Sequence, residues 1–257
     1  MNSPVIFNFQ SDISKIEPTG KLNNPFGIEV PEIARIAAIE FQKFIEVESR
    51  QWEYDFSVQK GKMFGVLVVQ SPNNKYHYLG AISGKLPGKV PCHHLIPSVF
   101  DGTTDNFFFN RGMTALTEMG IQINNSQSLA EIISLKEARR NKSIALQQRL
   151  FKNYNFLNIS GKEKNLLDIF KDTSQGVPPS AAGECAAPKL LQYAIKHQLK
   201  PVALTEFWWG IPNKERKSNT FYPACKNKCK PILEYMLEND TLYSDALQVK
   251  IMEPEYC

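Results

Sequence analysis

The segment Gly183-Glu-Cys-Ala-Ala-Pro-Lys-Leu-Leu-Gln-Tyr-Ala194 opens the part of the chain whose pattern decides the expected fold. It predicts a helix over residues 184–198, in which a proline in the first turn is tolerated. The apolar residues 201–208 then predict a strand, and residues 229–237 predict a second helix. Cys185 lies at the start of the first helix, and Cys225 and Cys229 flank the start of the second.

These three cysteines form a candidate metal site. Free N–H groups and the dipole at a helix N-terminus stabilise a thiolate. Three thiolates and one water molecule satisfy a four-coordinate zinc ion with one open position. Cys185, Cys225 and Cys229 are therefore candidate zinc ligands. The alternative is that they are small buried apolar residues, and a Cys-x-x-x-Cys pair alone does not decide between the two.

The residues before this unit predict a helix, a β-hairpin and a long helical insertion. Apolar spacing predicts a helix over residues 31–47, and strands over residues 63–70 and 76–83 flank a turn. Ser128-Leu-Ala-Glu131 matches a capping box, and a helical pattern without glycine or proline follows it to about residue 158. At 1.5 Å per residue such a helix would be an arm about 40 Å long. A short strand is expected over residues 247–252.

The order of hairpin, helix, strand, helix and strand resembles that of the zinc deaminase fold, in which the metal ligands lie at the starts of these two helices. The resemblance implies an α+β, three-layered fold with a mixed sheet and a long inserted helical arm. Residues 1–83 are then an N-terminal helix and hairpin part, and residues 84–180 a loop and helical insertion. Residues 181–257 are the cysteine-containing αβαβ part that completes one domain.

The cysteine motifs depart from the deaminase pattern in two places. Cys185-Ala-Ala-Pro-Lys189 is similar to the Cys-Ala-Glu-Pro-Lys form of some toxin-type deaminases, but Ala187 replaces the glutamate that transfers protons. The second motif, Pro223-Ala-Cys225-Lys-Asn-Lys-Cys229, has one extra residue before Cys225 and a third spacer residue. Glu184 is the candidate substitute acid/base, although it points about a third of a helical turn away from the expected face.

A wider resemblance covers most of the chain after about residue 60. The segment 183–194, Glu206-Phe-Trp-Trp-Gly210 and Phe221-Tyr-Pro-Ala-Cys225 with Lys228-Cys229 resemble the N-terminal region of the long bacterial RluA-type pseudouridine synthases. Residues 78–85 and 165–170 are similar to that region too. The His-Arg-Leu-Asp motif of these isomerases is absent, since Arg149-Leu150 is followed by Phe151. The resemblance implies a role in RNA modification without synthase catalysis by this chain.

Residues 200–231 contain an excess of basic over acidic side chains, interleaved with aromatic ones. Such a surface holds phosphates and stacks bases. The alternative is a solvated basic loop whose aromatic side chains fill the core. Trp208 and Trp209 are expected on opposite sides of their strand. The candidate RNA contacts are Lys214, Arg216, Lys217, Lys226, Lys228, Lys230, Trp208 and Trp209.

The composition is that of a folded soluble protein. Hydrophobic residues make up 42% of the chain and the formal net charge is +4, which excludes an acidic disordered tail and a collagen-like fibre. The longest apolar run, residues 64–69, is far shorter than the ~20 residues of a spanning helix. No secretory signal pattern is visible at the N-terminus, so a cytoplasmic protein without a membrane segment is expected.

Three functions are compatible with these features. The first is an RNA-modification accessory domain that binds RNA (rRNA or tRNA) or a separate pseudouridine synthase catalytic chain. The second is a zinc-dependent nucleobase deaminase-like hydrolase, in which Glu184 would be the acid/base. The third is a protein-interaction module that uses the long helix near residues 128–156.

Overall fold

The computed structural model describes residues 6–18, 21–86, 93–101 and 108–238. Within these residues the fold is α+β, as expected, with an antiparallel five-stranded sheet and six α-helices. The strand order is β1-β3-β2-β6-β7. The bounds of the strands are Phe7–Asn8 (β1), Lys62–Gln70 (β2), Tyr76–Ile82 (β3), Lys200–Trp209 (β6) and Phe221–Tyr222 (β7). The expected strand over residues 247–252 lies outside the described residues.

The centre of the sheet is the predicted hairpin. β2 and β3 pair antiparallel from Phe64 opposite Ile82 to Gln70 opposite Tyr76, which confirms both strands to within one residue. Asn74 has a φ of 62° in the connecting turn, a conformation that asparagine tolerates better than most residues. β6 pairs antiparallel with the other edge of β2.

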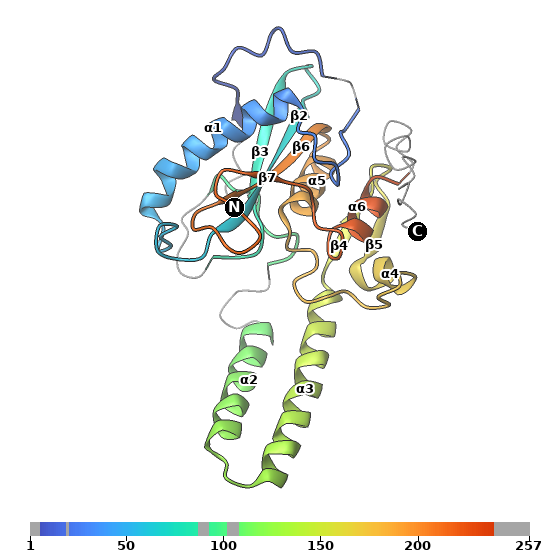
Figure 1. Cartoon of the computed structure of the whole chain (residues 1–257). Helices are drawn as coiled ribbons and strands as arrows, with labels where there is room; N and C mark the ends of the chain where they lie inside the picture. Colours follow the sequence, from blue (N-terminus) through green and yellow to red (C-terminus); the bar gives the residue numbers. More distant parts are fainter. Residues whose placement is uncertain (1–5, 19–20, 87–92, 102–107, 239–257) are drawn as a thin grey trace, which may run out of the picture.

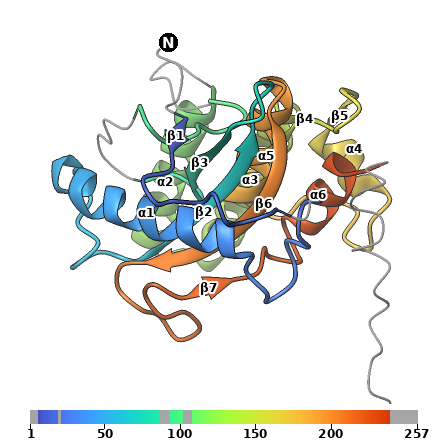
Figure 2. The ribbon, with the colours of Figure 1, turned by 90° about the horizontal axis from the view of Figure 1, so that it is seen from above.

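One helix covers each face of this sheet (Figure 2). α1 (Glu32–Glu48) begins after Pro31 and buries an apolar stripe that includes Ile33, Ala37 and Phe41 against β2 and β6. α5 (Ala186–Lys196) packs on the opposite face, against β2, β3 and β6. Both helices agree with the prediction from apolar spacing. A short 3₁₀-helix, η1 (Ser49–Gln51), follows α1.

The sheet is not mixed, contrary to the expectation, because every described strand pair is antiparallel. The chain leaves β3, covers one face of the sheet with α5 and returns as β6 on the far side of β2. β3 and β6 therefore run in the same direction, but β2 separates them and no parallel pair forms.

The helical arm consists of two helices rather than one (Figure 1). α2 (Phe108–Asn125), for which no element was predicted, lies beside α3 (Leu129–Phe151) and is connected to it by a short turn. The side chain of Leu146 occupies the space at Gly112, where an added Cβ would lie 2.5 Å from Leu146 Cδ1. Arg139 Nε donates a hydrogen bond to the carbonyl oxygen of Leu116 at 3.0 Å.

The start of α3 agrees with the capping prediction and its end does not. Ser128 Oγ accepts a hydrogen bond from the Glu131 N–H at 3.4 Å, but the Glu131 carboxylate accepts from Ser126 Oγ instead of reaching back to residue 128. α3 ends at Phe151, not near residue 158. The side-chain amide of Asn165 donates to carbonyl oxygens of residues 151, 152 and 154, so a distant residue satisfies the end of the helix.

The segment after the arm packs beneath α5. It forms β4 (Asn155–Leu157), β5 (Glu163–Asn165) and α4 (Leu166–Lys171), and α6 (Lys230–Met236) lies against it. Large side chains such as Phe156 and Phe170 are fully buried in the same apolar cluster as α5 and α6. This cluster holds the first turns of α5 and α6 in place. The proposed division at residues 83 and 180 stays a prediction.

Candidate metal centre

The three predicted cysteine ligands lie together in the structure. Cys185 is the residue that precedes the first turn of α5, and Cys229 is the residue that precedes α6. Cys225 lies one turn before Cys229, and the two are joined by a hydrogen bond from the Cys229 N–H to the Cys225 carbonyl oxygen at 3.2 Å. α5 packs against β6, and α6 packs against α5 in the same apolar cluster, which brings residues 40 positions apart in the chain close together.

The sulfur atoms are close enough to share one metal ion. All three Sγ atoms lie within 4.8 Å of one another, and those of Cys225 and Cys229 are 3.3 Å apart. In a tetrahedral zinc site with Zn–S bonds of ~2.3 Å, neighbouring sulfur atoms are about 3.8 Å apart. Cys229 is buried and the other two are partly buried. The three thiols therefore fit a metal ion with small adjustments of their side chains, and three ligands leave a fourth position open.

The three thiols differ in their electrostatic surroundings. Hydrogen bonds from the thiols of Cys185 and Cys229 lower the pKa of Cys225. The hydrogen bond with Cys225, together with burial, raises the pKa of Cys185. Hydrogen bonds with Cys185 and Cys225, together with burial, raise the pKa of Cys229. A metal ion binds the thiolate form, so metal binding would release the protons that these thiols hold.

A buried carboxylate adjoins this cluster. Glu206 faces α5 from β6, is only 6% exposed, and its Oε1 accepts a hydrogen bond from the Ala187 N–H at 3.2 Å. Burial raises the pKa of Glu206 to about 7. The charge of Glu206 in turn contributes to the raised pKa values of Cys185 and Cys229. We call the three cysteines and Glu206 the cysteine site.

A glycine makes room for this arrangement. Gly65 of β2 pairs directly with Glu206 of β6. A Cβ at Gly65 would lie 2.8 Å from Ala186 Cβ and 3.5 Å from Glu206 Cγ. The missing side chain therefore lets the first turn of α5 approach the sheet. Glu206 was not predicted as a site residue. Its one sequence signal is a carboxylate within a strand of apolar and aromatic residues.

Glu184, the predicted acid/base, has different partners. Its carboxylate forms an ion pair with Lys189 Nζ at 3.1 Å and accepts hydrogen bonds from Ser98 Oγ at 2.8 Å and from the Tyr154 hydroxyl. Burial would raise the pKa of Glu184, but Lys189 and these hydrogen bonds together lower it. We call Glu184, Lys189, Tyr154 and Ser98 the ion-pair cluster.

Lys189 is the centre of the ion-pair cluster. Only 2% of its side chain is exposed, and Nζ also donates to the carbonyl oxygens of Ile82 and Gly84 at 3.1 Å each. The ammonium group therefore ties α5 to the end of β3. No hydrogen bond in the described part of the chain connects Glu184 to a cysteine of the cysteine site.

The predicted RNA contacts lie on the segments that surround the cysteine site. Lys214 and Lys217 are exposed in the β6–β7 connection and Arg216 is half-buried there, with its guanidinium 5.4 Å from the centroid of the Trp208 ring. Lys226 is exposed and Lys228 half-buried between the two cysteines that precede α6. Lys230 lies 3.7 Å from Glu234, one turn along α6. The charge of Arg216 counteracts the raised pKa of Glu206, which shows that this loop is near the site.

The two tryptophans differ in burial, as expected for neighbouring residues whose side chains lie on opposite faces of β6. Trp208 is 7% exposed, and its Nε1 donates to the Ile211 carbonyl oxygen at 2.9 Å. Trp209 is half-buried and packs against the cluster on the α1 face. Trp208 is therefore a core residue in this structure, whereas Trp209 is only half-buried.

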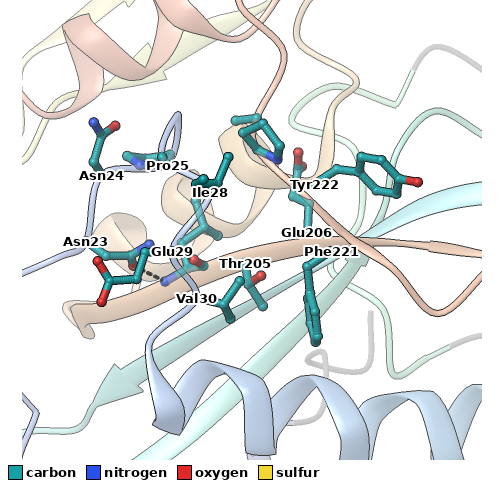
Figure 3. Close-up of a pocket in the computed structure, with 14 residues that line it drawn as sticks. Asn23, Asn24, Pro25, Ile28, Glu29, Val30, Thr205, Glu206, Phe221 and Tyr222 are labelled. Carbon is teal, nitrogen blue, oxygen red and sulfur yellow. Dashed lines mark hydrogen bonds between the residues drawn. The ribbon is translucent and has the colours of Figure 1, made fainter. Parts of the chain in front are cut away.

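A small cavity reaches Glu206 (Figure 3). It lies between the segment 23–30 and the β6–β7 strands, and its volume is about 40 Å³. Asn23 holds the segment on β6 by donating to the Leu204 carbonyl oxygen at 3.0 Å and accepting from its N–H at 2.8 Å. Ala224, the neighbour of Cys225, also lines this cavity. The cavity thus adjoins both Glu206 and the segment that carries a candidate ligand.

No protein-family model, curated protein or solved structure matches this chain. The candidate site consequently depends on the geometry described above. In the described part of the chain, no helix combines the length and the apolar character that crossing a membrane requires.

Proposed function

We propose that this chain is an RNA-modification-associated domain in which Cys185, Cys225 and Cys229 bind one zinc ion. The convergence of three sulfur atoms within 4.8 Å carries the metal-binding part of this proposal. Thiolate ligands favour soft or borderline ions, and zinc is the common ion for a site of three cysteines. Metal binding should stabilise the fold, because the ion would connect ligands at the starts of two separate helices, α5 and α6.

The RNA part of the proposal has independent support from surface charge. Lys214, Lys217 and Lys226 are exposed near the site, and Arg216 and Lys228 lie between them. Phosphates attract such a group without regard to sequence. Trp209 is half-buried, whereas Trp208 is buried, so Trp209 is the candidate of the pair for stacking. The partner would be an RNA, with a separate synthase chain as the alternative.

The metal content of the purified protein tests the first part. We expect one zinc per chain in the wild type and loss of the metal in both Cys185→Ser and Cys225→Ser. Protein prepared without chelator that contained no zinc, and that took up none on addition of Zn²⁺, would refute the proposal. Circular dichroism of the two variants would separate loss of a ligand from loss of the fold.

Binding of structured RNA at several salt concentrations tests the second part. Removing one lysine that neutralises a phosphate should reduce the slope of log K against log[salt] by about 1. We therefore expect Lys214→Gln combined with Lys217→Gln to weaken binding and flatten this slope. Lys171→Gln, an exposed lysine at the end of α4, is the matched control. Binding that is absent in the wild type, or unchanged by the double variant, would contradict the RNA function.

A zinc-dependent nucleobase deaminase-like hydrolase is the second candidate function. A specific observation favours it, namely that a buried carboxylate adjoins three thiols that leave one coordination position open. The order of β3, β2 and β6 with α5 on one face is also compatible with the deaminase-like order inferred from the sequence. Release of ammonia from bases, nucleosides or RNA is the corresponding measurement.

A further inference from the structure

We propose that Glu206 supplies the acid/base carboxylate that the α5 motif lacks at Ala187, acting on a water molecule at the open metal position. This inference depends on the zinc site and on the hydrolytic candidate function proposed above. It assigns the proton-transfer role to a residue of the neighbouring strand rather than to Glu184. Three observations support this role: the hydrogen bond between Glu206 and Ala187, the absence of Glu206 from the ligand group and its unused hydrogen-bonding capacity.

Glu206 contacts the backbone of the residue at which the expected glutamate is missing. The expected glutamate would be two residues after Cys185, at Ala187. Glu206 Oε1 accepts a hydrogen bond from the Ala187 N–H itself, at 3.2 Å. The carboxylate therefore reaches the first turn of α5 from β6. The small side chain of Ala187 and the absence of one at Gly65 leave the space that the longer glutamate occupies.

Glu206 is not a member of the candidate ligand group. In the described residues, the group of candidate ligand atoms within 4.8 Å of one another consists of three sulfur atoms and contains no carboxylate oxygen. A fourth protein ligand would close the site and exclude a reactive water. A carboxylate outside the ligand group instead leaves the fourth position to a water molecule.

The hydrogen bonds distinguish Glu206 from Glu184. Both oxygens of Glu184 have partners in the ion-pair cluster. Glu206 Oε1 is bound to Ala187, whereas Oε2 has no hydrogen-bond partner among the described residues. Glu206 also lines the cavity of Figure 3, whose volume of about 40 Å³ has room for water. A nucleobase is larger than this cavity.

The step that this arrangement supports is hydrolytic deamination of an amino-substituted nucleobase. Glu206 takes a proton from the water, whose oxygen forms a bond to the ring carbon that carries the amino group. Glu206 then delivers this proton to the amino nitrogen. The carbon–nitrogen bond breaks, its electron pair stays with the nitrogen and ammonia leaves. The second proton of the water moves from the new hydroxyl group to the adjacent ring nitrogen, so the ring carbon becomes a carbonyl. One water is consumed per ammonia released, and no oxidant or reductant is needed.

The test compares Glu206→Gln with wild type in the zinc-loaded protein. Ammonia release is measured with cytidine, adenosine, guanosine and a single-stranded RNA oligonucleotide containing all four bases. We expect release from at least one of these probes and a loss of 100-fold or more in Glu206→Gln, in the range of general acid–base contributions. Glu163→Gln, an exposed carboxylate of β5, is the matched control and should keep full activity.

Cobalt provides a readout that does not depend on activity. In the Co²⁺-loaded protein, Glu206→Gln should keep one metal per chain but shift the visible absorption bands, because the hydrogen bond to the bound water changes. Unchanged bands, activity within a few-fold of wild type, or no ammonia from any probe would each overturn the role of Glu206. Absence of metal binding in the wild type would instead refute the zinc site itself.

Discussion

Glu184 precedes the first turn of α5 and Glu206 reaches the same turn from β6, yet the two carboxylates have different surroundings. Glu184 is matched by a buried ammonium group and two hydroxyl donors. Glu206 is buried more completely, with one described hydrogen bond and three thiols nearby. The ion-pair cluster thus has the character of a structural connection. The cysteine site retains an incompletely paired acid where a ligand can act.

The largest effect should come from Glu184→Gln. This change leaves the ammonium group of Lys189 buried without its counter-charge, and breaking a buried pair in this way costs about 3–5 kcal/mol. Urea unfolding would measure the loss in the free energy of unfolding. Lys85→Met, at the exposed pair with Asp101, should cost less than about 1 kcal/mol and is the control. A cost below about 1 kcal/mol for Glu184→Gln would show that the ion-pair cluster is not structural.

The next largest effect on the free energy of unfolding should come from zinc, and it should depend on the cysteine site alone. Free Zn²⁺ at 100 times its dissociation constant should raise the free energy of unfolding of the wild type by about 2.7 kcal/mol. Cys229→Ser should abolish this increase, because it removes one of three ligands. Unfolding curves with and without Zn²⁺ would measure it. An equal increase in Cys229→Ser would place the metal elsewhere.

Gly65→Ala should cost about 1–3 kcal/mol through overpacking. Its new methyl group would lie 2.8 Å from Ala186 Cβ and 3.1 Å from Leu190 Cδ1, so α5 must shift away from the sheet. Gly120→Ala in α2 is the control, since its nearest contact is Arg139 Nε at 3.8 Å. A helix-interior Gly→Ala change of that kind should stabilise by about 0.5–1 kcal/mol. Thermal unfolding would compare both variants.

The smallest effect should be that of Glu206→Gln on stability. The amide keeps a carbonyl acceptor for the Ala187 N–H and removes a buried charge, so we expect a change below about 1 kcal/mol. Urea unfolding of the metal-free protein would measure this change beside that of Glu184→Gln. A loss comparable with that of Glu184→Gln would mean that both carboxylates are structural and would remove the contrast between the two regions.

Local patterns predicted much of the core correctly. The hairpin follows from apolar strands around a turn-forming segment, and α1 and α5 follow from apolar residues at helical spacing. Ser128 was correctly expected to cap α3, because its hydroxyl accepts from a backbone N–H only three residues away. Each of these features depends on residues within a few positions of one another.

Long-range contacts explain the errors. The helical pattern continues past Phe151, but Asn165 binds the last carbonyl groups and Tyr154 is buried in the core, so α3 stops. Two glycines weaken the helical signal of α2 in the sequence. In the structure one of them, Gly112, leaves the space into which the Leu146 side chain of α3 packs. The antiparallel pairing of β6 with β2 likewise depends on which edge of the hairpin the strand meets.

The placement of the three cysteines near helix starts was predictable from local sequence, because helix boundaries and apolar spacing are local properties of the chain. That their sulfur atoms lie within 4.8 Å of one another depends on long-range packing, because α6 packs against α5 and brings Cys225 and Cys229 to Cys185. The tertiary structure also decided the roles of the two carboxylates. Glu184 is next to Cys185 in the chain, but its carboxylate is bound by Lys189 and Tyr154. Glu206, from the neighbouring strand β6, instead accepts a hydrogen bond from the Ala187 N–H.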